Sequence, residues 1–185
     1  MKIVGITGTL GAGKGTIVDY LVQEKGFIHF SVRKYLIAEI EKQGLEVNRD
    51  NMVITANNLR AKHSPSFIIE ELFMQAKENG ENAIIESIRT PGEIAFLKKQ
   101  GYFLLLAIDA DPEIRFERIK GRKSSTDDVD FKTFVENEKR EFTSDDPNKQ
   151  NLEKCIEQAD ILIPNNGTID DLYQQLESRL NLNDE

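Results

Sequence analysis

Four glycines and one lysine stand within nine residues near the start of the chain, in the stretch GTLGAGKGT at residues 8–16. Glycine permits left-handed backbone conformations and leaves N–H groups open to an anion. An apolar run at residues 3–6 precedes the stretch, and a helical pattern follows it. At such a junction the free N–H groups and the helix dipole attract phosphate. The stretch therefore predicts a phosphate-binding loop, with a simple glycine-rich turn as the alternative.

The spacing of these residues fits the P-loop pattern G-x-x-x-x-G-K, with Gly8 and Gly13 as its glycines and Lys14 after them. The lysine would reach the terminal phosphates of a nucleotide as a compact positive charge. Gly15 stands where a hydroxyl residue usually follows, and the hydroxyl comes one position later at Thr16. A dinucleotide fingerprint needs G-x-G-x-x-G, which this spacing does not provide.

Length, composition and charge set limits on the class of protein. The 185 residues are 39% hydrophobic, which favours one globular domain spanning 1–185. The formal net charge of −8 disfavours a nucleic-acid partner and suits a small-molecule ligand. The single cysteine, Cys155, excludes an internal disulfide, and residues 1–8 enter a strand pattern without a secretory signal. Since no apolar run approaches the roughly 20 residues of a membrane span, we expect a cytoplasmic protein without membrane segments.

Short apolar runs alternate with longer amphipathic stretches, which is typical of a parallel sheet with crossover helices. We expect strands at residues 2–7, 27–30, 83–86, 103–108 and 161–163. Thr90, Pro91 and Glu93 have the types and spacing of a capping box before a helix, Asp111 and Pro112 offer a second start, and Thr168 a third. The pattern predicts an α/β protein of three layers, with about five parallel strands flanked by helices.

The loop resembles that of the adenylate kinase branch of P-loop proteins, GxxGxGKGT, with Leu10 where that branch commonly has proline. The resemblance implies a P-loop NTPase fold that binds ATP and Mg²⁺. The loop residues that it implies for nucleotide binding are Gly8, Gly11, Ala12, Gly13, Lys14, Gly15 and Thr16. Magnesium would be held by Thr16, by waters, or by an acidic residue further along the chain. Glu86, at the end of the third predicted strand, is the candidate; the alternative is an ordinary strand-end glutamate.

The stretch ESIRTP, residues 86–91, resembles the DGFPRT segment of adenylate kinases and the DGIRSP form of related P-loop kinases. Glu86 replaces the aspartate and Ser87 the glycine of that segment. The resemblance implies that Arg89 holds the acceptor phosphate, for which a planar guanidinium is well suited. The alternative is a surface arginine beside a helix.

The stretch RIKGRK, residues 118–123, resembles the RIVGRR segment that begins the lid of adenylate kinases. The resemblance implies a lid at about 119–142, in which the polar residues 123–130 form a mobile flap. It implies that Arg118 lies against adenine and that Arg122 contacts the transferring phosphate, the alternative being a solvated helix face. Arg140 is the candidate for a returning arginine, with Lys139 as its competitor.

The stretch ADILIPNNGT, residues 159–168, is similar to the final strand, loop and helix of dephospho-CoA kinases. In that family the main chain of the loop lines adenine, which makes Asn165, Asn166 and Gly167 candidates here. The alternative is a turn capped by Thr168.

The acceptor side matches the kinase pattern least. In FSVRKYLIAEI, residues 30–40, Ile37 stands where nucleoside-monophosphate kinases have an arginine, and Lys34 where they have an aspartate. Arg33, Lys34 or Arg60 could compensate. Residues 49–78 read as helices of an acceptor-binding flap at about 31–80. His29 and His63 are expected to be structural or exposed, and no metal-ligand cluster is visible in the sequence.

The sequence therefore predicts a kinase that moves the terminal phosphoryl group of ATP to a small acceptor, a nucleoside or deoxynucleoside monophosphate. Its catalytic residues would be Lys14, Arg89, Arg122 and Arg140. One alternative is dephospho-CoA kinase-like transfer to a sugar hydroxyl, although no base stands at the end of the first two strands. Another is a nucleotide-binding regulator or weak ATPase without an acceptor. A GTPase is disfavoured because NKQN, at residues 148–151, lacks the final aspartate of NKxD.

Overall fold

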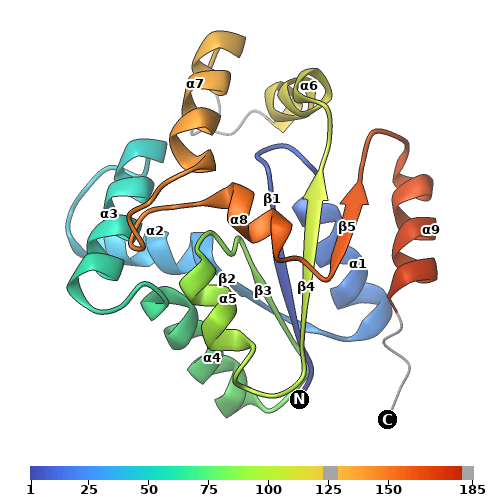
Figure 1. The fold of residues 1–185 in the computed structure, drawn as a ribbon, viewed down its shortest axis with the longest axis horizontal. Coiled ribbons are helices and arrows are strands. Elements are labelled where there is room, and N and C mark those ends of the chain that lie inside the picture. Colours follow the sequence, from blue (N-terminus) through green and yellow to red (C-terminus); the bar gives the residue numbers. More distant parts are fainter. Residues whose placement is uncertain (123–128, 181–185) are drawn as a thin grey trace.

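The structure, a computed structural model, describes residues 1–122 and 129–180 and contains one five-stranded sheet in the order β2-β3-β1-β4-β5 (Figure 1). All of the strand pairs are parallel. The strands are β1 (Ile3–Gly8), β2 (Ile28–Ser31), β3 (Ala83–Glu86), β4 (Phe103–Asp109) and β5 (Ile161–Pro164). The predicted α/β fold of about five parallel strands is thus confirmed, with strand ends displaced by one residue.

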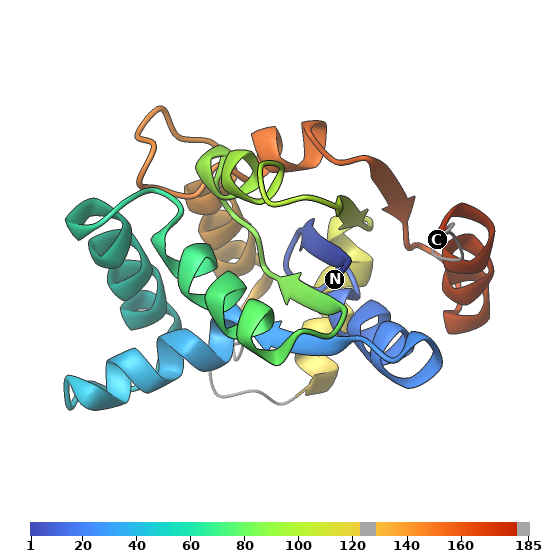
Figure 2. The same cartoon turned by 90° about the horizontal axis from the view of Figure 1, so that it is seen from below.

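Helices cover both faces of this sheet, as Figures 1 and 2 show. They are α1 (Lys14–Lys25), α2 (Val32–Lys42), α3 (Arg49–Lys62), α4 (Phe67–Asn79), α5 (Pro91–Leu97), α6 (Pro112–Arg122), α7 (Phe131–Phe142), α8 (Leu152–Glu157) and α9 (Ile169–Arg179). Residues of α1 and α9 belong to one core cluster, and residues of α2, α3, α4, α5 and α8 belong to the other. The sheet is the middle layer of three.

The alternation of the strands explains the two cores. In β1, Val4 and Ile6 enter the cluster with α1 and α9, whereas Ile3 enters the opposite cluster. In β4, Leu106 enters the cluster with α1 and α9, and Leu105 enters the opposite cluster. Successive side chains of a strand point to opposite faces, and both faces here are covered, so the runs are apolar throughout.

Two of the predicted helix starts are capping boxes in the structure. The Thr90 hydroxyl accepts from the Glu93 N–H at 3.2 Å, and the Glu93 carboxylate accepts from the Thr90 N–H at 3.0 Å. Thr168 and Asp171 form the same reciprocal pair at the start of α9. Each box satisfies N–H groups that a helix leaves unpaired at its first turn.

The topology places one junction at the centre of the molecule. β1 lies between β3 and β4, so the chain leaves on one side of β1 and later returns on the other. In open α/β sheets, ligands bind outside the carboxyl ends of the strands at such a switch point. The loop between β1 and α1 lies there, and the helices α2, α3 and α4, which connect β2 to β3, lie to one side of it (Figure 1).

Candidate active site

The glycines between β1 and α1 are required by close backbone contacts. Gly8, Gly11 and Gly13 have φ angles of 138°, 82° and 106°. A Cβ atom at Gly8 would overlap the carbonyl oxygen of Ile108 in β4, and one at Gly11 would lie 2.5 Å from the carbonyl oxygen of Arg115. Because side chains rarely adopt these conformations and have no space here, the loop keeps its bare backbone.

The loop after β5 supports the glycine-rich loop from the other side. The Asn165 amide donates to the Ala12 carbonyl at 2.7 Å, and a Cβ atom at Gly13 would overlap that amide. Arg118 donates to the Asn165 carbonyl at 2.9 Å. The structure therefore brings Arg118 and Asn165, two of the predicted adenine neighbours, into contact beside the loop.

The other predicted adenine neighbours lie slightly further away. The Asn166 side chain accepts from the Asp111 N–H at 2.8 Å, which links the loops after β4 and β5. Gly167 lies where a Cβ atom would be 2.5 Å from the Asp171 carboxylate, so it makes room for the α9 capping box. Both residues are exposed.

Lys14, the first residue of α1, folds back over the loop. Its ammonium donates to the carbonyl of Gly8 at 3.0 Å and to that of Thr9 at 2.7 Å. Burial, with a smaller contribution from the nearby Arg89 cation, lowers the pKa of Lys14 to about 7, while Glu86 acts in the opposite direction. Since a buried cation gains from an anionic partner, a phosphate at this position would favour the charged form of Lys14.

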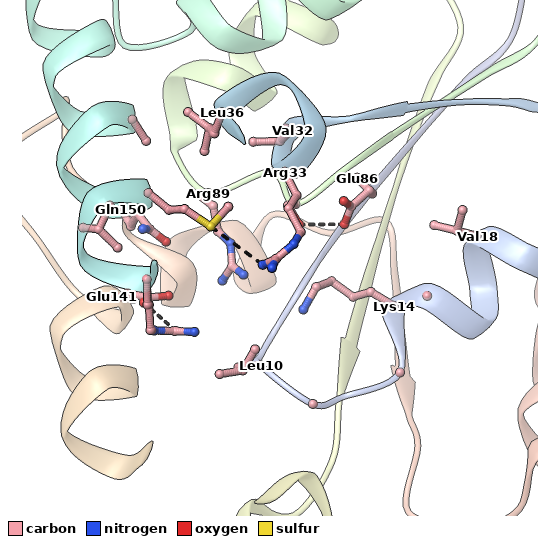
Figure 3. Close-up of a pocket in the computed structure, with 18 of the residues that line it drawn as sticks. Leu10, Lys14, Val18, Val32, Arg33, Leu36, Glu86, Arg89, Glu141 and Gln150 are labelled. Carbon is pink, nitrogen blue, oxygen red and sulfur yellow. Dashed lines mark hydrogen bonds and ion pairs between the residues drawn. The ribbon is translucent and has the colours of Figure 1, made fainter. Parts of the chain in front are cut away.

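A cavity of about 490 Å³ extends from the glycine-rich loop to α2 and α3. Lys14, Glu86, Arg89 and Arg122 all line it, together with Arg33. In Figure 3 the side chains of Lys14, Arg33 and Arg89 point into the same space. The structure thus gathers Lys14, Glu86, Arg89 and Arg122, predicted site residues from three separate segments of the chain, around a single cavity.

Glu86, at the end of β3, is surrounded by polar side chains. Its carboxylate accepts from the Ser31 hydroxyl at 3.3 Å and from the Ser87 hydroxyl at 2.6 Å. His29 Nε2 lies 3.9 Å from the same carboxylate, and burial lowers the pKa of His29. His29 therefore lines the cavity, whereas His63 stacks on Phe67 at 4.0 Å.

The oxygen groups near the loop suit magnesium. Thr16 lies in the first turn of α1, and Glu86 lines the cavity. A hydroxyl and a carboxylate are hard oxygen ligands, which Mg²⁺ prefers alongside phosphate oxygens and waters. Within the described part of the chain, no group of three or more His, Cys, Asp or Glu residues could hold a metal ion by itself. The phosphates of a nucleotide would have to complete such a site.

Arg140 is not among the residues that line the cavity. It donates to the Asp50 carboxylate at 3.1 Å, in an exposed pair between α7 and α3. The neighbouring Glu141 accepts from Arg49 at 2.6 Å. Lys139 is exposed. Of the predicted lid, α6 ends at Arg122 and α7 begins at Phe131, while residues 123–128 lie outside the described residues.

The cavity has a second wall, the acceptor wall, on α2 and α3 in the predicted flap at about 31–80, most of whose lining residues the sequence interpretation did not name. On α3 its lining residues are Arg49, Met52, Val53, Ala56 and Arg60, and on α2 they include Val32 and Leu36. The α3 positions are i, i+3, i+4, i+7 and i+11, the spacing of one helix face. This periodicity was the available signal, and it places an arginine at each end of an apolar strip about 16 Å long.

The residues proposed to replace the missing arginine at position 37 have different environments. Arg60 is 2% exposed and donates twice to the Glu93 carboxylate, at 3.1 and 2.8 Å. Arg33 lines the cavity, and Lys34 is exposed. Arg60 is thus tied to the residue that caps α5, and through it to the segment that carries Arg89, because Glu93 also accepts from the Arg89 N–H at 2.7 Å.

The fold and the glycine-rich loop define a P-loop protein of kinase-like architecture. A family model described as an AAA domain matches residues 4–144. The chain belongs to the UPF0200 family: it is 34% identical over 181 residues to a UPF0200 protein of Methanococcus maripaludis strain C6, covering 96% of this chain and 95% of that one. It is 30% identical over 183 residues to a UPF0200 protein of Methanocaldococcus jannaschii, covering 97% and 89%.

Solved structures agree with this architecture. Shikimate kinase from Bacteroides thetaiotaomicron superposes with a TM-score of 0.60 at 15% identity, over 98% of this chain and 99% of that one. A gluconokinase from Sinorhizobium meliloti 1021 gives 0.55 at 12% identity, over 94% and 88%. The predicted P-loop NTPase fold is therefore confirmed. Among residues 1–122 and 129–180, no helix has both the length and the apolar character to cross a membrane.

Proposed function

We propose that the protein is an ATP-dependent phosphotransferase that moves the terminal phosphoryl group to a nucleoside or deoxynucleoside monophosphate. The observation that carries the proposal is the single cavity that joins the phosphate-binding loop to an acceptor wall, with Lys14, Glu86, Arg89 and Arg122 around it. Phosphoryl transfer needs little covalent chemistry from the protein, so positioning and charge are sufficient.

Each predicted site residue has a role in this proposal. The loop N–H groups and Lys14 hold the terminal phosphates, with Arg118, Asn166 and Gly167 near the adenine. Arg89 and Arg122 meet the charge that develops in the transition state. Thr16 and Glu86 would hold Mg²⁺, which would supply positive charge to offset the charge of the phosphates. Arg140 would join them after release from Asp50.

The character of the acceptor wall favours a nucleotide. Val32 and Leu36 of α2 and Met52 and Val53 of α3 give it an apolar surface, which suits a flat heterocycle. A polyol would leave many of its hydroxyls without partners on such a surface. The arginines at the same cavity suit the acceptor phosphate, because guanidinium binds two phosphate oxygens at once.

A second candidate is transfer to a hydroxyl group. Glu86 lines the cavity and could take the proton from a hydroxyl acceptor, although the sequence interpretation named it only as a magnesium ligand. The structurally similar proteins include shikimate kinase and gluconokinase, whose names denote acceptors other than nucleotides. For this second candidate, dephospho-CoA is the acceptor with a sugar hydroxyl that should be compared with the nucleoside monophosphates.

The test is a transfer assay with ATP labelled in its terminal phosphate. The panel would contain ribo- and deoxynucleoside monophosphates, dephospho-CoA, shikimate and gluconate. Label in a nucleoside diphosphate supports the proposal, and label in a hydroxyl acceptor supports the second candidate instead. Label released only as inorganic phosphate contradicts both candidate transfer reactions. It supports instead a nucleotide-binding regulator or an ATPase without an acceptor.

A further inference from the structure

Unpaired buried polar atoms collect around the cavity. Among the described residues, five buried side-chain nitrogen or oxygen atoms have no hydrogen-bond partner, and four of them belong to cavity-lining residues. These four are His29 Nε2, Arg49 Nε, Arg60 Nη1 and Gln150 Oε1. Buried polar groups in folded proteins are almost always paired. The concentration of exceptions here indicates that a ligand supplies the missing partners.

The cavity has a reacting end and a far end. Lys14 marks the reacting end, since it belongs to the loop that would hold the terminal phosphate of ATP. Glu141 and Gln150 lie on the opposite side of the cavity (Figure 3). Because the reacting atom of an acceptor must approach the terminal phosphate, groups at the far end contact the part of the acceptor that does not react.

The two unpaired groups at the far end are held in place by their neighbours. Arg49 donates through Nη2 to Glu141, whose side chain is 8% exposed, at 2.6 Å, which leaves Nε as its unpaired donor. The residue after Gln150 is anchored, because the Asn151 N–H donates to the Arg89 carbonyl at 2.9 Å and its side-chain amide to the Ser144 carbonyl at 2.7 Å. The Arg49 side chain and the backbone next to Gln150 are therefore held in place before a ligand binds.

We infer that Gln150 and Arg49 select the acceptor by binding the edge of its base. The oxygen of Gln150 needs an N–H donor, and Nε of Arg49 needs an acceptor. The edge of a nucleobase supplies both, either as a ring N–H beside a carbonyl or as an amino group beside a ring nitrogen, and the apolar side chains of Met52 and Val53 line the same cavity. This inference rests on the proposed function and adds the residues that hold the base of the acceptor.

The experiment compares acceptors and variants at saturating ATP. The wild-type protein should have a higher kcat/KM for a nucleoside monophosphate than for ribose 5-phosphate, which carries the phosphate but no base. Gln150→Leu should raise KM for nucleoside monophosphates roughly tenfold, the effect of leaving one polar pair unmade, with kcat and the KM for ATP unchanged. Gln150→Glu retains an acceptor oxygen and should retain the wild-type KM. Gln174→Leu, on the exposed side of α9, is the matched control.

The outcomes separate this inference from the proposed function. If nucleoside monophosphates are phosphorylated but Gln150→Leu does not change their KM, the inference is overturned and the proposed function stands. If ribose 5-phosphate is phosphorylated as efficiently as the nucleoside monophosphates, the inference is overturned in the same way. If no nucleoside monophosphate accepts the label, both fail. Melting curves of the variants confirm that each is folded.

Discussion

The two ends of the cavity differ in how their polar groups are satisfied. In the glycine-rich loop, Lys14 donates to the carbonyls of Gly8 and Thr9, and Asn165 donates to that of Ala12. On the acceptor side, Arg49 and Gln150 keep buried polar atoms without a partner in the described structure. The side chains at the loop are thus paired before a ligand binds, whereas two on the acceptor side are not. We infer that discrimination between acceptors lies on the acceptor side.

The largest effect should come from Lys14→Ala. Removing the ammonium takes away a preorganised charge at the transferring phosphate, so turnover should fall by roughly 10²–10³ or more. Because the loss is at the loop, it should be the same for every acceptor. Steady-state kinetics with two acceptors would check this, with Lys25→Ala, an exposed lysine of the same helix, as control. Turnover at the wild-type rate would remove Lys14 from the mechanism.

On the acceptor side, Arg60→Met should act on stability. It leaves the Glu93 side chain, 1% exposed, as a buried charge without its cation, which destabilises the fold by about 3–5 kcal/mol. The double variant Arg60→Met with Glu93→Gln should recover much of this loss, because glutamine can keep the capping box of α5. Urea unfolding measures both. A single variant as stable as wild type would show that the pair is not needed.

A smaller effect is expected for Gly8→Ala. Its φ of 138° and the overlap of a Cβ atom with the Ile108 carbonyl should destabilise the fold by about 1–3 kcal/mol. Gly15→Ala is the matched control, since a Cβ atom there would meet nothing within 4 Å. Thermal melting without nucleotide should separate the two variants. Equal melting temperatures would contradict the assigned loop conformation.

The smallest expected effect is the uptake of protons when ATP binds. With a pKa of about 7, Lys14 is largely neutral at pH 8 in the free protein. A bound triphosphate favours the charged form, so ATP binding at pH 8 should take up a fraction of one proton, and far less at pH 6, where Lys14 is already charged. Calorimetry in buffers of different ionisation enthalpy measures this uptake. The Lys14→Ala variant should lack it, and no uptake by the wild type would contradict the lowered pKa.

Local signals made the fold predictable. The apolar strand β1 is buried on both faces, and Thr90 with Glu93 forms the capping box that their spacing indicated. The glycine-rich loop was equally predictable because its close contacts are made by the backbone. The glycines Gly8 and Gly13 mark positions where the backbone adopts conformations that other residues rarely adopt. The sequence also predicted Arg89 and Arg122 as site residues, because both lie within recognisable motifs. In the structure both line the cavity.

The acceptor side was not predictable in the same way. Arg49 and Gln150 come from segments about a hundred residues apart, and only the packing of α3 against the chain before α8 gives them a common cavity. Neither lies in a motif. Arg140 was assigned from a local resemblance, but its ion pair with Asp50 on α3 depends on the same long-range packing. Side-chain recognition between distant segments leaves no local pattern in the sequence.

The most direct test is a crystal structure with a non-hydrolysable ATP analogue and Mg²⁺. The account predicts that the triphosphate lies within residues 8–16, with the Lys14 ammonium moved from the Gly8 and Thr9 carbonyls to phosphate oxygens. A triphosphate bound elsewhere, with Lys14 still donating to those two carbonyls, would contradict it.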